Sequence, residues 1–167
     1  MMSSTSRSAE PFNGIRRAYA LLFLYLIEVI EEIGTDRALE ALQRAAERQA
    51  DIVAEELRRG MPHGLGPFDS GLEAYSRFMA DAGADVEIHR RNGSSATAAV
   101  RRCPFYEALL DVGVDCGYFL GGLCSHLTLP AIQSTLKRFD PRLKLEAEVM
   151  RQSAEEICLE RIELRGA

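Results

Sequence analysis

Apolar residues recur at every third or fourth position along the first third of the chain. Between Phe12 and Ile33 this spacing predicts a helix, and Gly34 supplies the left-handed residue that commonly ends one. Thr35-Asp36 is a good helix cap, and a second apolar face follows it as far as Gly60. We therefore expect two long helices at the start of the chain, packed as an antiparallel pair.

The pattern changes from helix to strand near the middle of the chain. A loop rich in glycine and proline, from Met61 to Pro67, precedes a third helix that Asp69-Ser70 would cap and that ends near Gly83. Beyond it apolar and charged residues alternate, Asn92-Gly93 is a typical hairpin turn, and residues 97–102 can pair back. The sequence thus predicts a β-hairpin after the third helix.

A second round of helix and hairpin completes the chain. Pro104 suits the first turn of a helix, and a further helical stretch over residues 116–139 restarts at Pro130. Alternating residues predict strands over 143–149 and 157–164. This order favours an α+β fold over a parallel doubly wound sheet. In it, the N-terminal helical pair packs with a small antiparallel β-sheet formed by two hairpins, with helices between them.

The composition is that of an ordinary globular domain. Apolar residues make up 47% and charged residues 27% of 167 residues, and a chain of this length can bury a core without disulfides or metals. We expect a single domain over residues 11–167. The short polar stretch over residues 1–10 resembles a disordered leader rather than a signal peptide.

The charge pattern excludes two classes of partner. A net charge of −5 disfavours nucleic-acid binding, which needs clustered basic residues. The apolar run from Ala18 to Ile27 is ended by Glu28, so it is too short for a membrane span. We expect a cytoplasmic protein whose partner is a small-molecule substrate.

Four cysteines are candidates for chemistry, namely Cys103, Cys116, Cys124 and Cys158. Without an export signal we expect them to be reduced thiols, and none forms a CxxC pair. Cys124 and His126 lie close together in an apolar, glycine-flanked stretch. A thiolate beside an imidazole is a competent nucleophile, and the same pair can ligate a divalent transition metal. The alternative is a buried structural cysteine beside a partly exposed histidine.

Glu160 is a second candidate, because the period of a strand places it on the same face as Cys158. If that face is inward, burial would raise the pKa of the carboxyl toward that of a general acid or base. The alternative is a Glu160 that lies on a solvated edge or pairs with Arg161. Apolar residues occur on both faces of this strand, so the pattern leaves both options open.

Four segments carry a resemblance to a known family: RRCPFYEALLDVG (101–113), GLCSHL, FDPRLKLEAEVM and EEICLERI. Together they resemble the L-2-amino-thiazoline-4-carboxylic acid hydrolase family. Cys103-Pro104 is similar to the family's Cys-Pro element, Cys124 to its central cysteine, and Asp140-Pro141 to its turn. Cys158 is similar to its last cysteine. The helical stretch EEIGTDRALEALQRAAE is also similar, so the resemblance covers nearly the whole chain.

The resemblance implies hydrolytic opening of a small carboxylate-bearing heterocycle at its amidine-like carbon. It implies Cys124 as nucleophile or metal ligand, and His126 or Glu160 as proton carrier. Arg102 would clamp the substrate carboxylate, with Cys103 and Cys158 also at the substrate. Whether a divalent transition metal is bound stays open.

Two other functions compete with a hydrolase. The chain is also similar in style to the 4-vinyl reductase domain, a small hydrophobic-ligand module, with a pocket expected at Phe119, Leu123 and Leu127. The third hypothesis is an assembly protein, a homodimer formed through the broad apolar surface of the helix between Ala18 and Val29.

Overall fold

The computed structural model describes residues 9–113 and 124–166. Most of the expected leader therefore lies outside the described residues, as do Cys116 and the first part of the helical stretch predicted over 116–139. The first helix already begins at Ala9, within the range expected to be leader.

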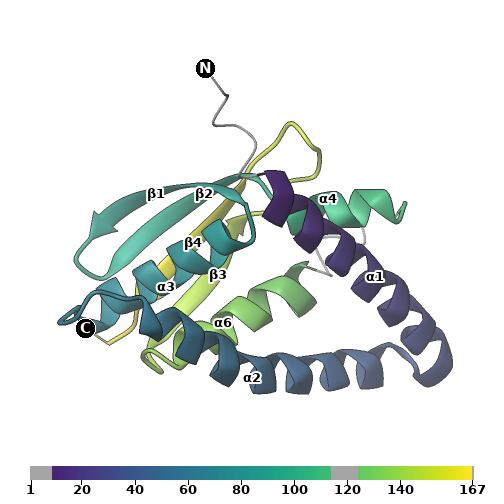
Figure 1. Ribbon diagram of the computed structural model, residues 1–167, viewed down its shortest axis with the longest axis horizontal. Coiled ribbons are helices and arrows are strands. Elements are labelled where there is room, and N and C mark those ends of the chain that lie inside the picture. Colours follow the sequence, from purple (N-terminus) through teal and green to yellow (C-terminus); the bar gives the residue numbers. More distant parts are fainter. Residues whose placement is uncertain (1–8, 114–123, 167) are drawn as a thin grey trace.

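The two N-terminal helices meet at Gly34 and then diverge. Helix α1 (Ala9–Ile33) ends there, and α2 (Thr35–Arg59) begins directly after it. Gly34 has a φ of 85°, as expected for a left-handed residue, but it is also the N-cap of α2. The predicted Thr35-Asp36 cap is therefore wrong, because α2 already begins at Thr35 and Gly34 takes the capping position. In Figure 1 the helices form a V rather than a close antiparallel pair; α1 packs mainly on α4 (Pro104–Asp111) and α2 on α6 (Leu129–Lys137).

Gly83, just after helix α3 (Pro67–Asp81), packs closely against Phe12 near the start of α1. Pro67 occupies the first turn of α3 and Gly66 is its N-cap, three residues before Asp69 of the predicted cap. Gly83 has a φ of 73°, and a Cβ there would lie 2.9 Å from both the Cβ and the backbone nitrogen of Phe12. Only glycine permits this approach of the two helices.

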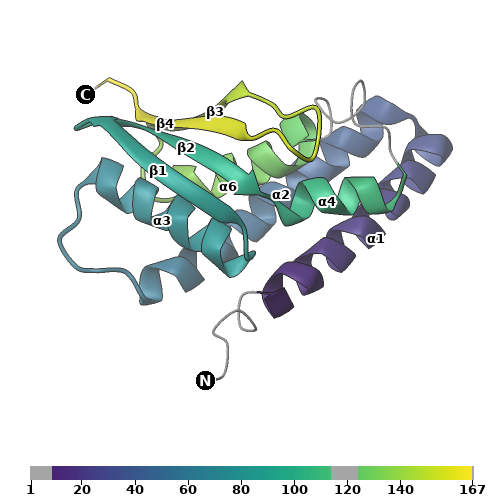
Figure 2. The ribbon, with the colours of Figure 1, turned by 90° about the horizontal axis from the view of Figure 1, so that it is seen from above.

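Four strands form one antiparallel sheet, as the sequence predicts. They are β1 (Asp85–Asn92), β2 (Ser95–Arg102), β3 (Leu143–Val149) and β4 (Cys158–Leu164). Their spatial order is β1-β2-β4-β3, so each hairpin is intact and β2 pairs with β4 at the centre. The sheet forms one layer, with the helices gathered on one side of it (Figure 2). The α+β architecture expected from the order of elements is confirmed.

The core lies between the sheet and α3, α4 and α6. The side chains that fill it are almost completely buried: Tyr75, Met79, Val100, Phe105, Ile132, Leu136, Leu143 and Ile162. Pro130 falls in the first turn of α6, as predicted. The π-helical turn η1 (Cys124–Thr128) leads directly into α6. Cys124 is the first residue of this turn.

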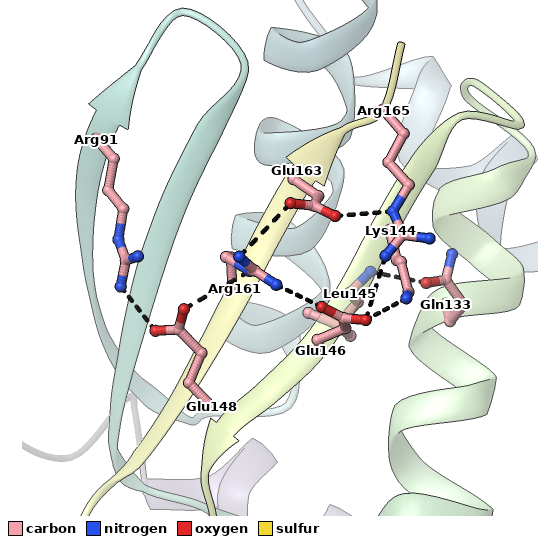
Figure 3. A network of polar contacts seen from close by, with 9 residues as sticks. All are labelled: Arg91, Gln133, Lys144, Leu145, Glu146, Glu148, Arg161, Glu163 and Arg165. Carbon is pink, nitrogen blue, oxygen red and sulfur yellow. Dashed lines mark hydrogen bonds and ion pairs between the residues drawn. The ribbon is translucent and has the colours of Figure 1, made fainter.

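The opposite face of the sheet carries a network of alternating charges (Figure 3). Arg161 at its centre donates to Glu146 at 2.6 Å, and Arg91 from β1 donates to Glu148 at 2.7 Å. The edge strand β3 is closed by Gln133 of α6, whose side chain bonds the backbone of Leu143 and Leu145. These contacts leave the charged face as the outside of the molecule and protect its edge from further pairing.

Among the residues that the structure describes, no helix is both long and apolar enough to cross a membrane.

Candidate functional site

A small, partly open cavity lies where β2, β4, α3, α4, η1 and α6 converge. Its volume is about 30 Å³, enough for a water molecule. Most of its wall is apolar, but three thiols, one carboxyl and one guanidinium also line it. These are Cys103, Cys124, Cys158, Glu160 and Arg151. Residues from both hairpins and from the helices between them thus meet at one point.

Glu160 faces the helices and not the solvent. It is 8% exposed, and on the neighbouring strand it lies opposite Ala98, which is completely buried. The Tyr75 hydroxyl of α3 donates to Glu160 Oε2 at 2.7 Å. Arg161, which points to the other face, pairs with Glu146 instead. The alternative of a Glu160 on a solvated edge or paired with Arg161 is therefore wrong.

The environment of Glu160 favours its protonated form. Burial raises the pKa of this carboxyl, while the Tyr75 hydrogen bond and the nearby charge of Arg151 only partly oppose that effect. Burial and the neighbouring Glu160 also raise the pKa of Tyr75, so its hydroxyl remains a donor. A carboxyl whose pKa is shifted toward neutrality is suited to exchanging protons in the cavity.

Arg151 is a buried cation at the other side of the cavity. It comes from the turn between β3 and β4 and is 6% exposed. Its Nε donates to Cys158 Sγ at 3.3 Å, its Nη2 donates to the carbonyl of Val100, and its guanidinium lies 5.1 Å from the centre of the Tyr106 ring. Within the described ranges, no carboxylate forms an ion pair with it. The guanidinium therefore offers a positive charge to whatever enters the cavity.

Cys103 lies at the N-cap of α4, where two effects on its thiol compete. Desolvation disfavours the thiolate, whereas hydrogen bonds from the backbone of Tyr106 and Phe105 favour it. Desolvation is the larger effect and raises the pKa of Cys103 to about 12. At neutral pH Cys103 is a protonated thiol.

Cys124 reaches the cavity from η1, and π-helical turns of this kind are frequent at functional sites. Burial raises the pKa of its thiol, and the neighbouring Cys103, Cys158 and Glu160 raise it further. Cys124 is thus not a resting thiolate. Cys158 accepts a hydrogen bond from Arg151 and thus contacts a cation.

Two residues expected at the site lie away from the cavity. His126 follows Cys124 by two positions on a helical turn, so it points elsewhere and is exposed. Arg102 is on the surface, 3.4 Å from Glu107 and stacked 3.6 Å from the centre of the Phe12 ring. The structure therefore does not bring Cys124 together with His126, and the cavity cation is Arg151 rather than Arg102.

The pocket expected for a hydrophobic ligand is also placed differently. Phe119 and Leu123 lie outside the described residues. Leu127 packs in a second apolar cluster with Phe23 and Leu109, and it does not line the cavity.

A larger, more open hollow of about 480 Å³ lies among α1, α2, α3 and α6. Its wall is mixed, with Tyr19, Val53 and Phe78 among the apolar residues and Gln49 and Glu56 among the polar ones. None of the three described cysteines lines it. Its volume suits a small organic molecule.

The described part of the chain contains no cluster of side chains suited to bind a metal ion. No group of three or more histidine, cysteine, aspartate or glutamate side chains there could hold a metal ion. The metal-ligand role of Cys124 stays a prediction.

No family model, curated protein or solved structure matches this chain. The resemblance to the thiazoline-carboxylate hydrolases accordingly stays a prediction, based on the motifs quoted above.

Sequence reasoning missed Arg151 and Tyr75. Tyr75 has the spacing of an apolar residue on α3, and nothing in that spacing indicates a carboxyl partner 85 positions away. Arg151 stands among the polar residues between two strands and resembles any surface arginine. One signal was available: it precedes Cys158 by seven residues across a hairpin connection, which allows the two side chains to meet.

The raised pKa of Glu160 predicts how stability depends on pH. A carboxyl whose folded-state pKa is raised contributes stability that is fully present below the unfolded pKa, about 4.3, and is lost as pH rises through the folded pKa. Glu160→Gln keeps an acceptor for Tyr75 but cannot ionise. Urea unfolding at a series of pH values should show this variant gaining stability relative to the wild type as pH rises above about 4.3. A constant difference across that range would contradict the assignment.

Proposed function

We propose that the cavity is the active site of a hydrolase that opens a small carboxylate-bearing heterocycle of the thiazoline or cyclic-amidine type. The observation that carries the proposal is the burial of Arg151 and Glu160 together in one cavity. Burying ionisable groups costs several kcal/mol per ion, so their joint presence in a core is a functional-site signal. The resemblance to the thiazoline-carboxylate hydrolases supplies the substrate class.

The proposal assigns one task to each polar group. Arg151 binds the substrate carboxylate through its guanidinium, which forms no ion pair with a carboxylate of the described residues. Glu160 is the proton carrier in place of His126, held in position by Tyr75. Because burial keeps Cys124 and Cys103 protonated, the nucleophile is a water molecule rather than a resting thiolate.

The reaction adds one water molecule across the amidine bond. The water oxygen bonds to the amidine carbon and becomes the carbonyl of a carbamoyl group. The ring C–N bond breaks, and the two water protons end on the departing nitrogen, which becomes a free amine. Glu160 accepts the first proton and returns it to that nitrogen, so it must pass through both protonation states.

The cavity is too small for a substituted ring as it stands. At about 30 Å³ it accommodates a water molecule but not a five-membered heterocycle. Substrate entry therefore requires the walls to move apart. The three described cysteines are free, and a reducing compartment such as the cytoplasm fits this proposal.

An assay of 2-amino-thiazoline-4-carboxylate turnover, measured as the release of the amine, tests the roles proposed for Glu160 and Arg151. Glu160→Gln should lower kcat by about 10²- to 10⁴-fold, since it removes the proton carrier. Arg151→Gln should raise KM by about 10- to 100-fold, the value of a charge-assisted hydrogen bond. The wild type should prefer this substrate over the analogue without a carboxylate, and Arg151→Gln should lose that preference.

Arg102→Gln is the matched control for Arg151, because it removes a surface guanidinium from the same end of the sheet and should leave KM unchanged. Wild-type protein that does not open the ring, or Glu160→Gln with undiminished kcat, would overturn the proposal. Circular dichroism of each variant separates loss of activity from loss of the fold.

A second candidate function, binding of a hydrophobic ligand without catalysis, is favoured by the 480 Å³ hollow. Its volume lies in the range of small-molecule pockets, which are mostly apolar with a few polar groups. The site of such a ligand would be among the helices and not at the thiols.

Filling the hollow tests this second function. Ala46 lines it and Ala45 is an exposed neighbour on the same helix. Ala46→Trp should abolish binding of the apolar fluorescent probe anilinonaphthalene sulfonate, whereas Ala45→Trp should not. Equal binding by both variants, measured by fluorescence titration, would exclude the hollow as the site.

A further inference from the structure

The outward face of α1 carries an uncovered apolar stripe. Leu21, Leu24 and Tyr25 are 69%, 50% and 64% exposed. Their spacing of three and four residues places them on one side of the helix. The other side of α1 buries Phe23 and Leu26 in the cluster around α4. Large exposed apolar side chains gather here more than on any other described element.

Charges of opposite sign bound this stripe. Arg17 lies four residues before Leu21, and Glu28 lies four residues after Leu24; both are exposed. The two charges are about 16 Å apart along the helix, too far to pair with each other. The stripe thus has a basic end, an apolar centre and an acidic end, arranged symmetrically about the midpoint between Leu21 and Leu24.

This pattern is complementary to itself. If a second α1 lies antiparallel about that midpoint, Arg17 faces Glu28 of the second copy, and Leu21 faces Leu24 of the second copy. Both contacts occur twice, as a two-fold interface requires. An anionic membrane surface fits less well, since amphipathic helices that bind membranes carry basic residues along the stripe.

We propose that the chain forms a homodimer through antiparallel packing of two α1 helices, with the two-fold axis between Leu21 and Leu24. The contact would hold the outer side of α1 in place. Its inner side packs against α4, whose Tyr106 lines the cavity. The proposed dimer does not depend on the proposed hydrolase activity, and a separate experiment tests it.

Charge reversal tests the arrangement by sedimentation equilibrium of the full chain. Arg17→Glu and Glu28→Arg each turn two attractive pairs into repulsive ones and should weaken the dimer about tenfold. The double variant Arg17→Glu/Glu28→Arg should regain wild-type affinity, because each reversed charge meets a reversed partner. An equal mixture of the two single variants should form heterodimers. Intrachain effects cannot explain this rescue, given the distance between the two residues.

The control is Arg37→Glu, which reverses an exposed arginine on α2, away from the stripe, and should not change the affinity. A monomeric wild type would overturn the proposal. So would a dimer that tolerates Arg17→Glu and Glu28→Arg singly, since its interface would lie elsewhere or be parallel. Failure of rescue in the double variant would also contradict the antiparallel register.

Discussion

The burial of Glu160 is the constraint on which the arrangement of the site depends. The period of strand β4 places Glu160 between Cys158 and Ile162 on the face that packs against the helices, and pairing with β2 sets it opposite Ala98. A carboxyl in that place needs a partner, and Tyr75 of α3 provides one at 2.7 Å. Arg151 then supplies a cation close enough to lower the pKa of the same carboxyl. Glu160, Arg151 and the three thiols line the cavity.

Desolvation dominates the chemistry of this cavity. The N-terminus of α4 favours a thiolate at Cys103, yet burial still raises the pKa of that thiol to about 12. The same effect raises the pKa of Cys124 and Glu160. The outer face of the sheet shows the contrast, because hydrogen bonds from Lys144 and Arg161 lower the pKa of Glu146 to about 2. The two faces of one sheet therefore shift the pKa of their carboxyl groups in opposite directions, which favours the inner face for proton transfer.

Much of the fold could be predicted from the sequence, because each element has a local signal. Asn92-Gly93 marks the first hairpin, Pro104 and Pro130 mark helix starts, and alternation marks β3 and β4. The residues of the candidate site could be predicted from the sequence only in part. Cys103, Cys124, Cys158 and Glu160 were selected by residue type and resemblance, and they do meet at one cavity. His126 and Arg102 were selected for their position in the sequence, but a helical turn and a surface contact direct them away. Arg151 and Tyr75 depend on long-range packing, which no local pattern encodes.

The protonation state of Glu160 tests the account most directly. Carbon-13 NMR of the glutamate side-chain carboxyl carbons can follow each group through a pH titration, with the Glu160 signal assigned by its absence in Glu160→Gln. The account predicts that this carboxyl titrates well above the ordinary glutamate value of about 4.3. Titration at or below that value would show that Glu160 is ionised at neutral pH, and would contradict the proton-carrier role and the burial argument behind it.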